Sequence, residues 1–321
     1  MFYSIIASYV IIHLNALIKG STLHKKTKGY LMIATAGCLW GLVGFFVKKL
    51  LDAQLPLSTI IFWRMFFAFI VLFLYLYFTD RSKLKIEREI LKYVIAIGLI
   101  SQCLFNISYF TAIRITSIAT AVTLLYTAPI FIAIMARIFF QELFTANKIA
   151  ALLLCVAGCF LTVTGGSWEN IELNSTGILM GLAAGLTFAS LTILSKPISN
   201  KCHHYTIVFY SIGFGLLFYL PFSQPLILFQ EGTGLIIWFY AFSLSIIATI
   251  FAYLFYIGGL SMGIEASKAG IISTVEVVVA VIVSYIFFNE QLVGLKLLGI
   301  LMVIGSVITV QLNRLTVFKK S

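Results

Sequence analysis

Apolar segments of about 20 residues recur along the whole chain and are separated by short polar stretches. Each has the length that an α-helix needs to cross roughly 30 Å of hydrocarbon at about 1.5 Å per residue. Segments of about ten residues with alternating polarity, typical of a transmembrane β-barrel, do not occur. The pattern predicts an all-α integral membrane protein with ten transmembrane helices, at residues 30–50, 57–78, 90–111, 117–138, 147–165, 176–195, 205–222, 235–257, 267–288 and 294–312.

The composition agrees with this fold class. The 321 residues are 61% hydrophobic and 10% charged, whereas soluble domains are roughly 45–50% apolar. Residues 2–18 form a further apolar stretch, but it is short and contains His13 and Asn15. An interfacial helix, a signal-like segment and an extension upstream of the true start codon all fit it. We predict that residues 1–28 are an extension outside the core.

Lysine and arginine fall unevenly on the two sides of the predicted bundle. With both core termini in the cytoplasm, 17 of the 22 basic residues are cytoplasmic and four are outside, while Arg64 lies within a span. The positive-inside rule favours this orientation, with residues 313–321 as a cytoplasmic tail of a cell (inner) membrane protein. Cationic loops facing anionic lipid explain the net charge of +11, so we predict a lipid-bilayer partner and no nucleic acid. Both a monomer and a homodimer remain open.

Five cysteines lie within spans or at a cytoplasmic end, and no disulfide framework is predicted. Cys155 and Cys159 share a helix face, so soft-metal transport was weighed, but no carboxylate ligand is near them in sequence. Buried cysteine more often packs as a small hydrophobe. We predict no metal and no cofactor. The sequence also contains no GxxxxGK[ST], HExxH or GxSxG motif, so neither an ATP-driven pump nor an enzyme is predicted.

The chain contains an internal repeat at an offset of 148 residues. Residues 29–48 and 177–196 are identical at six of 20 positions, and FFQE, which ends at Glu142, matches FFNE, which ends at Glu290. The first repeat is predicted at 29–165 and the second at 176–312. Because each unit has five spans, the second enters the membrane from the opposite side. Such inverted repeats are characteristic of secondary transporters.

Several motifs, taken in this order and spacing, carry a family resemblance. They are LWG at 39–41, Arg64 in span 2, ATIFAYLFYIGGL at 248–260, and spans 4 and 9 that each end in a glutamate. With these the chain resembles the EamA family of the drug/metabolite transporter superfamily. The resemblance implies ten helices, cytoplasmic termini and export or exchange of small metabolites, with amino acids and related solutes among the substrates.

One position departs from the family pattern. Family members often have Glu-Pro in span 9, whereas this chain has Glu276-Val277. Proline occurs only at the repeat-related position of span 4, as Pro129. A kink of span 9 therefore lacks the proline that would cause it, although Gly270 can loosen the first turns of this span.

Glu276 is the first candidate for the transport site. It lies about midway through span 9, where a charge costs on the order of 2.5–3.5 kcal/mol, so it is expected to face the bundle interior or water. Three roles remain open for it: a proton carrier, a contact for a substrate ammonium group, or a protonated carboxyl that bonds to a neighbouring helix.

Further polar and aromatic side chains at similar depth are candidates for substrate binding. Arg64 can contact a substrate carboxylate, snorkel outward or bond to backbone carbonyls. Trp40, surrounded by glycines, can project into a cavity or pack in the core. The complete predicted set is Trp40, Arg64, Gln102, Asn106, Tyr126, Pro129, Tyr253 and Glu276. By contrast, Glu142 and Glu290 are interpreted as solvated caps near the membrane surfaces.

The sequence thus predicts a secondary transporter that moves small metabolites by alternating access, with efflux or exchange and proton coupling at Glu276. Two alternatives stay open. A lipid or head-group flippase would use the same fold with a lateral opening, and a membrane-embedded enzyme would need chemistry that no motif of the chain indicates.

Overall fold

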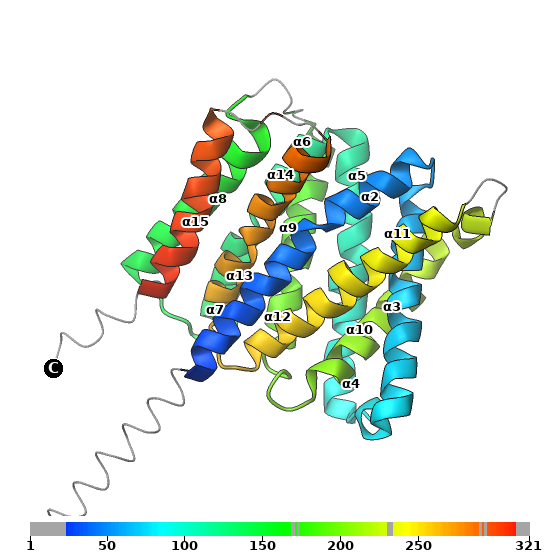
Figure 1. The fold of residues 1–321 in the computed structure, drawn as a ribbon. Coiled ribbons are helices and arrows are strands. Elements are labelled where there is room, and N and C mark those ends of the chain that lie inside the picture. The colour runs from blue at the N-terminus through cyan, green and yellow to red at the C-terminus, as the bar shows by residue number, and fades with distance from the viewer. Residues whose placement is uncertain are drawn as a thin grey trace, which may run out of the picture.

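A computed structural model describes residues 24–167, 171, 174–229, 234–288, 291 and 294–312. All regular elements within these ranges are helices, and they form one bundle (Figure 1). Ten helical segments are long and apolar enough to cross a membrane, as predicted: His24–Asp52, Leu57–Thr79, Arg88–Ile115, Ile118–Phe140, Ala146–Thr164, Ser175–Ser195, His204–Phe222, Leu235–Leu260, Ala266–Phe288 and Leu295–Leu312. We refer to them as spans 1 to 10.

Six spans contain a turn or a change in helix type: spans 1, 3, 4, 7, 8 and 9. Span 1 comprises a helix over 24–41 and α2 (Val43–Asp52). The elements of spans 2 to 5 are α3 (Leu57–Thr79), α4 (Arg88–Ala96), η2 (Ile97–Leu104), α5 (Phe105–Ile115), α6 (Ile118–Leu125), α7 (Ala128–Phe140) and α8 (Ala146–Thr164). The elements of spans 6 to 10 are α9 (Ser175–Ser195), α10 (His204–Tyr219), α11 (Leu235–Ser245), η5 (Ile246–Phe251), α12 (Ala252–Leu260), α13 (Ala266–Ser273), α14 (Val275–Phe288) and α15 (Leu295–Leu312). Short 3-10 turns occur at η1 (Arg81–Leu84), η3 (Leu220–Phe222) and η4 (Pro225–Phe229).

The packing of the spans follows the sequence repeat. Spans 5 and 10, which are repeat partners, pack directly on each other through α8 and α15. Spans 3 and 4 pack on α9 of span 6, and spans 8 and 9 pack correspondingly on α2 of span 1. Two cation–π contacts also match: the Lys196 ammonium lies 5.3 Å from the Phe140 ring centroid, and that of Lys48 lies 3.9 Å from Phe288. The two five-helix repeats are therefore related by inversion, as the sequence predicts.

The irregular parts of the helices also recur at the repeat offset. The π-helical segment η2 of span 3 corresponds to η5 of span 8, and the interruption between α6 and α7 in span 4 corresponds to that between α13 and α14 in span 9. π-Helical turns are rare in general and often occur at functional sites. The four interruptions thus concentrate irregular backbone in the spans that carry most of the candidate residues.

Span 9 is broken although it lacks the proline. The helix is interrupted at Thr274, whose hydroxyl donates to the Ile271 carbonyl at 2.6 Å. In span 4 the Thr127 hydroxyl donates to the Leu124 carbonyl in the same way, also at 2.6 Å. A threonine hydroxyl that bonds a backbone carbonyl competes with the helical ladder and bends helices. In span 9 the break therefore arises at Thr274 and does not need the proline that Val277 replaces.

Two glycines of span 1 allow it to lie against the broken part of span 9. A Cβ atom added to Gly41 would come within 2.7 Å of the Glu276 carbonyl oxygen, and one added to Gly37 within 2.6 Å of the Ser273 carbonyl oxygen. Small residues at this spacing permit close helix contact in membranes. The contact fixes the backbone of Glu276 against span 1.

Hydrogen bonds tie spans 2 and 7 together at both ends of the bundle. At one end, Tyr210 and Thr206 of α10 donate to the carbonyls of Leu84 and Lys83 in the 81–84 turn, at 2.6 and 2.7 Å. At the other end, the Trp63 indole donates to the Pro225 carbonyl at 2.9 Å. The first turn of span 1 and the last turn of span 10 lie at the same end (Figure 1). The predicted extension and tail lie outside the described residues, except that helix already covers 24–28.

Candidate transport site

A small cavity lies where the interruptions of spans 4 and 9 meet. Both repeats contribute to its wall, because Tyr126, Ala128 and Pro129 come from the first and Phe188, Thr274 and Glu276 from the second. It has room for about one water molecule. In this conformation the cavity is therefore too small for a solute larger than water.

A hydrogen bond crosses this cavity between the two repeats. The Tyr126 hydroxyl, at the end of α6, donates to Glu276 Oε1 at 3.2 Å. Glu276 lies in the first turn of α14, and Pro129 lies in the first turn of α7. The two helix breaks thus bring together three residues of the predicted set.

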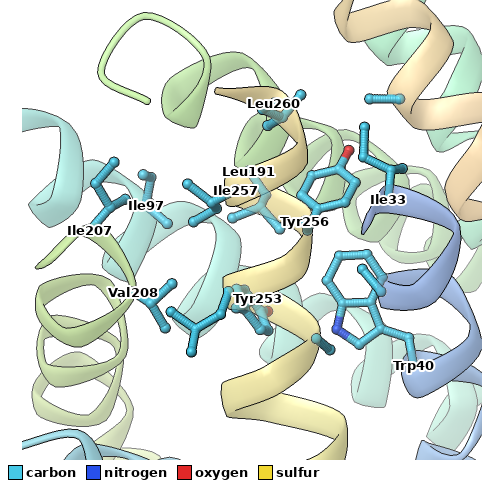
Figure 2. Close-up of a cluster of buried hydrophobic side chains, with 14 of the residues drawn as sticks. Ile33, Trp40, Ile97, Leu191, Ile207, Val208, Tyr253, Tyr256, Ile257 and Leu260 are labelled. Carbon is cyan, nitrogen blue, oxygen red and sulfur yellow. The ribbon is translucent and has the colours of Figure 1, made fainter. Parts of the chain in front are cut away.

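Trp40 belongs to an aromatic cluster with Tyr253 and Tyr256 (Figure 2). Its ring centroid lies 5.0 Å from that of Tyr256, 5.5 Å from Tyr253 and 5.9 Å from Phe188. Phe188 also lines the cavity. The Tyr256 hydroxyl shares a 2.6 Å hydrogen bond with Thr192 of span 6. Trp40 is 8% exposed, so it packs in the core of this conformation, one aromatic ring away from the Glu276 cavity.

Arg64, Gln102 and Asn106 belong to a second polar region. Gln102 is buried, and its Nε2 atom has no hydrogen-bond partner. The Arg64 Nε atom is also buried without a partner. The Asn106 amide instead donates one of its two N–H groups to the Gln102 carbonyl of its own helix. Tyr253 lies within hydrogen-bonding reach of the Gln102 side chain and within electrostatic range of both Arg64 and Glu276, so it is close to both regions. Within the described ranges, Arg64 and Glu276 form no direct ion pair.

The interpretation of Glu142 as a solvated cap is wrong. Its side chain is only 8% exposed and lies 2.7 Å from the Lys196 ammonium of span 6. It accepts hydrogen bonds from the backbone N–H groups of Ala266 and Ser267, at 2.6 and 3.1 Å. Glu142 therefore caps the N-terminus of α13, a helix 124 residues further along the chain. Glu290 lies outside the described residues.

Further charges complete this contact, which we call the Glu142 knot: Glu142, Lys148, Lys196, Glu265 and Lys268. Lys148 pairs with Glu265 and lies 3.8 Å from Glu142, and Lys268 lies 3.4 Å from Glu265. Burial raises the pKa of Glu142, but hydrogen bonds from Lys196 and Ser267 outweigh it and leave the pKa below the ordinary 4.5. The knot joins spans 4, 5, 6 and 9 at one end of the bundle.

Sequence reasoning missed several neighbours of the site. Phe188 was one aromatic residue among many apolar ones. Thr274 carried no signal beyond its place two residues before Glu276. The Cys155 thiol lies 3.4 Å from the Thr274 hydroxyl, so a cysteine of span 5 touches the break of span 9. Within the described residues, no three His, Cys, Asp or Glu side chains are grouped to hold a metal ion.

The fold and the central cavity define an integral membrane protein built from two inverted five-helix repeats. The sequence pattern of the EamA-like transporter family matches the chain twice, at residues 27–164 and 175–312. The protein belongs to this family.

Relatives resemble the chain over most of its length. An uncharacterized transporter of Archaeoglobus fulgidus is 28% identical over 281 residues, which cover 87% of this chain and 95% of the relative. The uncharacterized inner membrane transporter YicL of Salmonella typhimurium is 24% identical over 296 residues, 89% of this chain and 96% of the relative. A solved crystal structure with 16% identity aligns at a TM-score of 0.75, covering 89% of this chain and 97% of that one. That likeness supports the fold.

Proposed function

We propose that this protein is a secondary transporter that moves small metabolites, amino acids or related solutes, across the cell membrane by alternating access, through efflux or exchange. The observation that carries the proposal is the Tyr126–Glu276 hydrogen bond, which closes a cavity between the symmetric breaks of spans 4 and 9. Broken helices at the interface of inverted repeats are where such carriers bind their substrates. Trp40 and Tyr253 extend this site, with Gln102 and Arg64 beyond them.

We assign proton coupling to Glu276. It is the carboxyl group in the cavity wall, and its hydrogen bond comes from a tyrosine of the opposite repeat. When the repeats separate, Tyr126 leaves the carboxyl and water replaces it. The balance between the protonated and the ionised form then depends on which side is open.

We propose that the protein lies in the cell (inner) membrane, with the Glu142 knot and both core termini on the cytoplasmic side. This orientation is supported by the 17-to-four distribution of basic residues. The proposal holds for a monomer and for a homodimer. The bilayer and the small solute are the partners that it requires.

Counterflow in liposomes tests the proposed function. Purified protein in vesicles preloaded with pooled metabolites should accumulate the corresponding labelled solute transiently, whereas protein-free vesicles should not. A fluorescent-lipid scrambling assay on the same vesicles addresses the flippase alternative. Scrambling without counterflow of any solute would contradict the proposal, and chemical conversion of a solute would indicate the enzyme alternative.

A further inference from the structure

Arg64 is a charge within a membrane span, and no counter-charge pairs with it among the residues that the structure describes. It lies in the first third of α3, and no carboxylate within the described ranges forms an ion pair with it. Its Nε atom is buried and has no acceptor. Charged groups at this depth normally pair or face a substrate pathway because their burial is costly. The residues around Arg64 therefore indicate what it is missing.

These neighbours offer donors and no negative charge. Gln102 is 1% exposed, and its Nε2 atom has no partner. The phenols of Tyr253 and Tyr219 lie within electrostatic range of the guanidinium. A cation surrounded by hydrogen-bond donors is complementary to an anion.

The fold itself does not require this polar pair. At the repeat offset of 148 residues, Arg64 corresponds to Ile212 and Gln102 to Ile250. Both isoleucines are buried in the core, with exposures of 0% and 4%. The second repeat thus fills the same positions with apolar side chains that need no partner. Arg64 and Gln102 introduce polarity into one half of the molecule at positions where packing is satisfied without it.

We propose that Arg64 and Gln102 form an anion subsite that binds a carboxylate group of the transported solute. The planar guanidinium presents a rigid fork of donors that matches a carboxylate, and the Gln102 amide, which lies against Tyr253 and whose Nε2 atom makes no hydrogen bond of good geometry, adds a further donor. The Tyr253 phenol lies within electrostatic range of both Arg64 and Glu276, so the solute spans both regions, with its carboxylate at Arg64. This inference rests on the proposed function and names its substrate class.

The anion subsite has a consequence for the transport cycle. A bound carboxylate neutralises Arg64, whereas the empty carrier must reorient with this charge unpaired in the membrane interior. Reorientation is therefore faster when the subsite is loaded. Exchange of one carboxylate for another is expected to outpace net movement.

A double-mutant cycle tests the missing counter-charge without any ligand. Gln102→Glu places a carboxylate of nearly the same size beside Arg64, and thermal unfolding of the purified full chain is the readout. We expect Gln102→Glu to keep or raise Tm. The change in Tm of the double variant Arg64→Gln, Gln102→Glu should lie at least about 2 °C below the sum of the changes in the two single variants. Gln224→Glu, at an exposed position, controls for the added charge. An equal loss of Tm from Gln102→Glu in both backgrounds, or failure of that single variant to fold, would overturn the subsite.

The charge requirement is tested with phenylacetate and its neutral amide, phenylacetamide. Phenylacetate should raise the Tm of the unaltered protein, and the rise should be smallest for Arg64→Gln. Arg114→Gln, which changes an exposed arginine, should respond like the unaltered chain. Equal responses to acid and amide would contradict an anion subsite. Counterflow separates the two proposals. If Arg64 and Gln102 are coupled in the double-mutant cycle but no solute shows counterflow, the anion subsite stands and the transporter is rejected. If a solute shows counterflow but the two residues are not coupled, the transporter stands and the anion subsite is rejected.

Discussion

The Glu142 knot allows a quantitative prediction. Glu142→Gln removes the negative charge that Lys196 contacts at 2.7 Å and that caps Ala266 at 2.6 Å. The amide keeps one acceptor and turns an NH2 group towards donors, so two lysines lose a counter-charge and α13 loses part of its cap. Breaking a buried ion pair by removing one partner costs about 3–5 kcal/mol. With about 2–4 °C of Tm per kcal/mol, this corresponds to a fall of about 6–20 °C.

The same carboxylate gives the direction of the pH dependence. Its pKa is lower in the folded protein than the ordinary 4.5. The stabilisation is therefore complete above about pH 4.5 and is lost as the pH falls through the folded-state pKa. The Tm of the unaltered protein should decline in acid over this range, and that of Glu142→Gln should decline less.

The assay is thermal unfolding in detergent at a fixed scan rate, at several pH values from about 3.5 to 7. Glu89→Gln, which changes an exposed glutamate in the first turn of α4, is the control. A Tm of Glu142→Gln that matches this control at neutral pH would refute the reasoning. It would mean that the Glu142 contacts add nothing to the stability of the bundle.

Three further predictions address the glycine contact, the break in span 9 and the orientation. Gly41→Ala should lower Tm, because the added Cβ meets Val279 Cβ at 2.6 Å and such overpacking costs about 1–3 kcal/mol of stability, whereas Gly44→Ala has open space and should not lower Tm. Thr274→Val removes the hydroxyl bond to Ile271 and should impair counterflow with little change in Tm, whereas Thr309→Val, whose bond lies in an unbroken helix, should leave counterflow intact. Cysteines at Ser82 and Gln224, in a background without the native cysteines, should be labelled by an impermeant reagent from opposite faces, Ser82 from the cytoplasm. Labelling of both from one face would contradict the inverted arrangement.

The ten spans and the inverted repeat could be predicted because both depend on local composition. A span must be apolar along about 20 residues whatever it packs against, and an odd number of spans per repeat determines the inversion. The repeat also placed Pro129 at the depth of Glu276, since positions related by the pseudo-two-fold axis lie at equal depth, but it did not show that Tyr126 donates to Glu276. Sequence alone could not show that the Asn106 amide donates a hydrogen bond to the Gln102 carbonyl of its own helix.

The Glu142 knot and the break in span 9 depend on contacts between distant segments. A glutamate two residues past a span has the same local sequence whether water or α13 surrounds it. Glu142 was therefore wrongly interpreted as solvated, because its burial depends on a tertiary contact. The sequence pattern linked a break of span 9 to a proline, but the Thr274 hydroxyl also competes with the helical hydrogen bonds. In each case the missing information was which carbonyl or N–H group lies within reach of the side chain.

The central claim is that the carboxyl of Glu276 couples proton movement to solute transport. The most direct measurement compares two activities of Glu276→Gln in liposomes, using the solute that counterflow identifies, with Glu89→Gln as the matched control. Because glutamine mimics the protonated carboxyl, accumulation driven by a pH gradient should be abolished while solute exchange remains measurable. Loss of both activities together would indicate that Glu276 binds an ammonium group of the solute. Full pH-driven accumulation by Glu276→Gln would contradict the claim and leave Glu276 as a hydrogen-bonding partner of Tyr126.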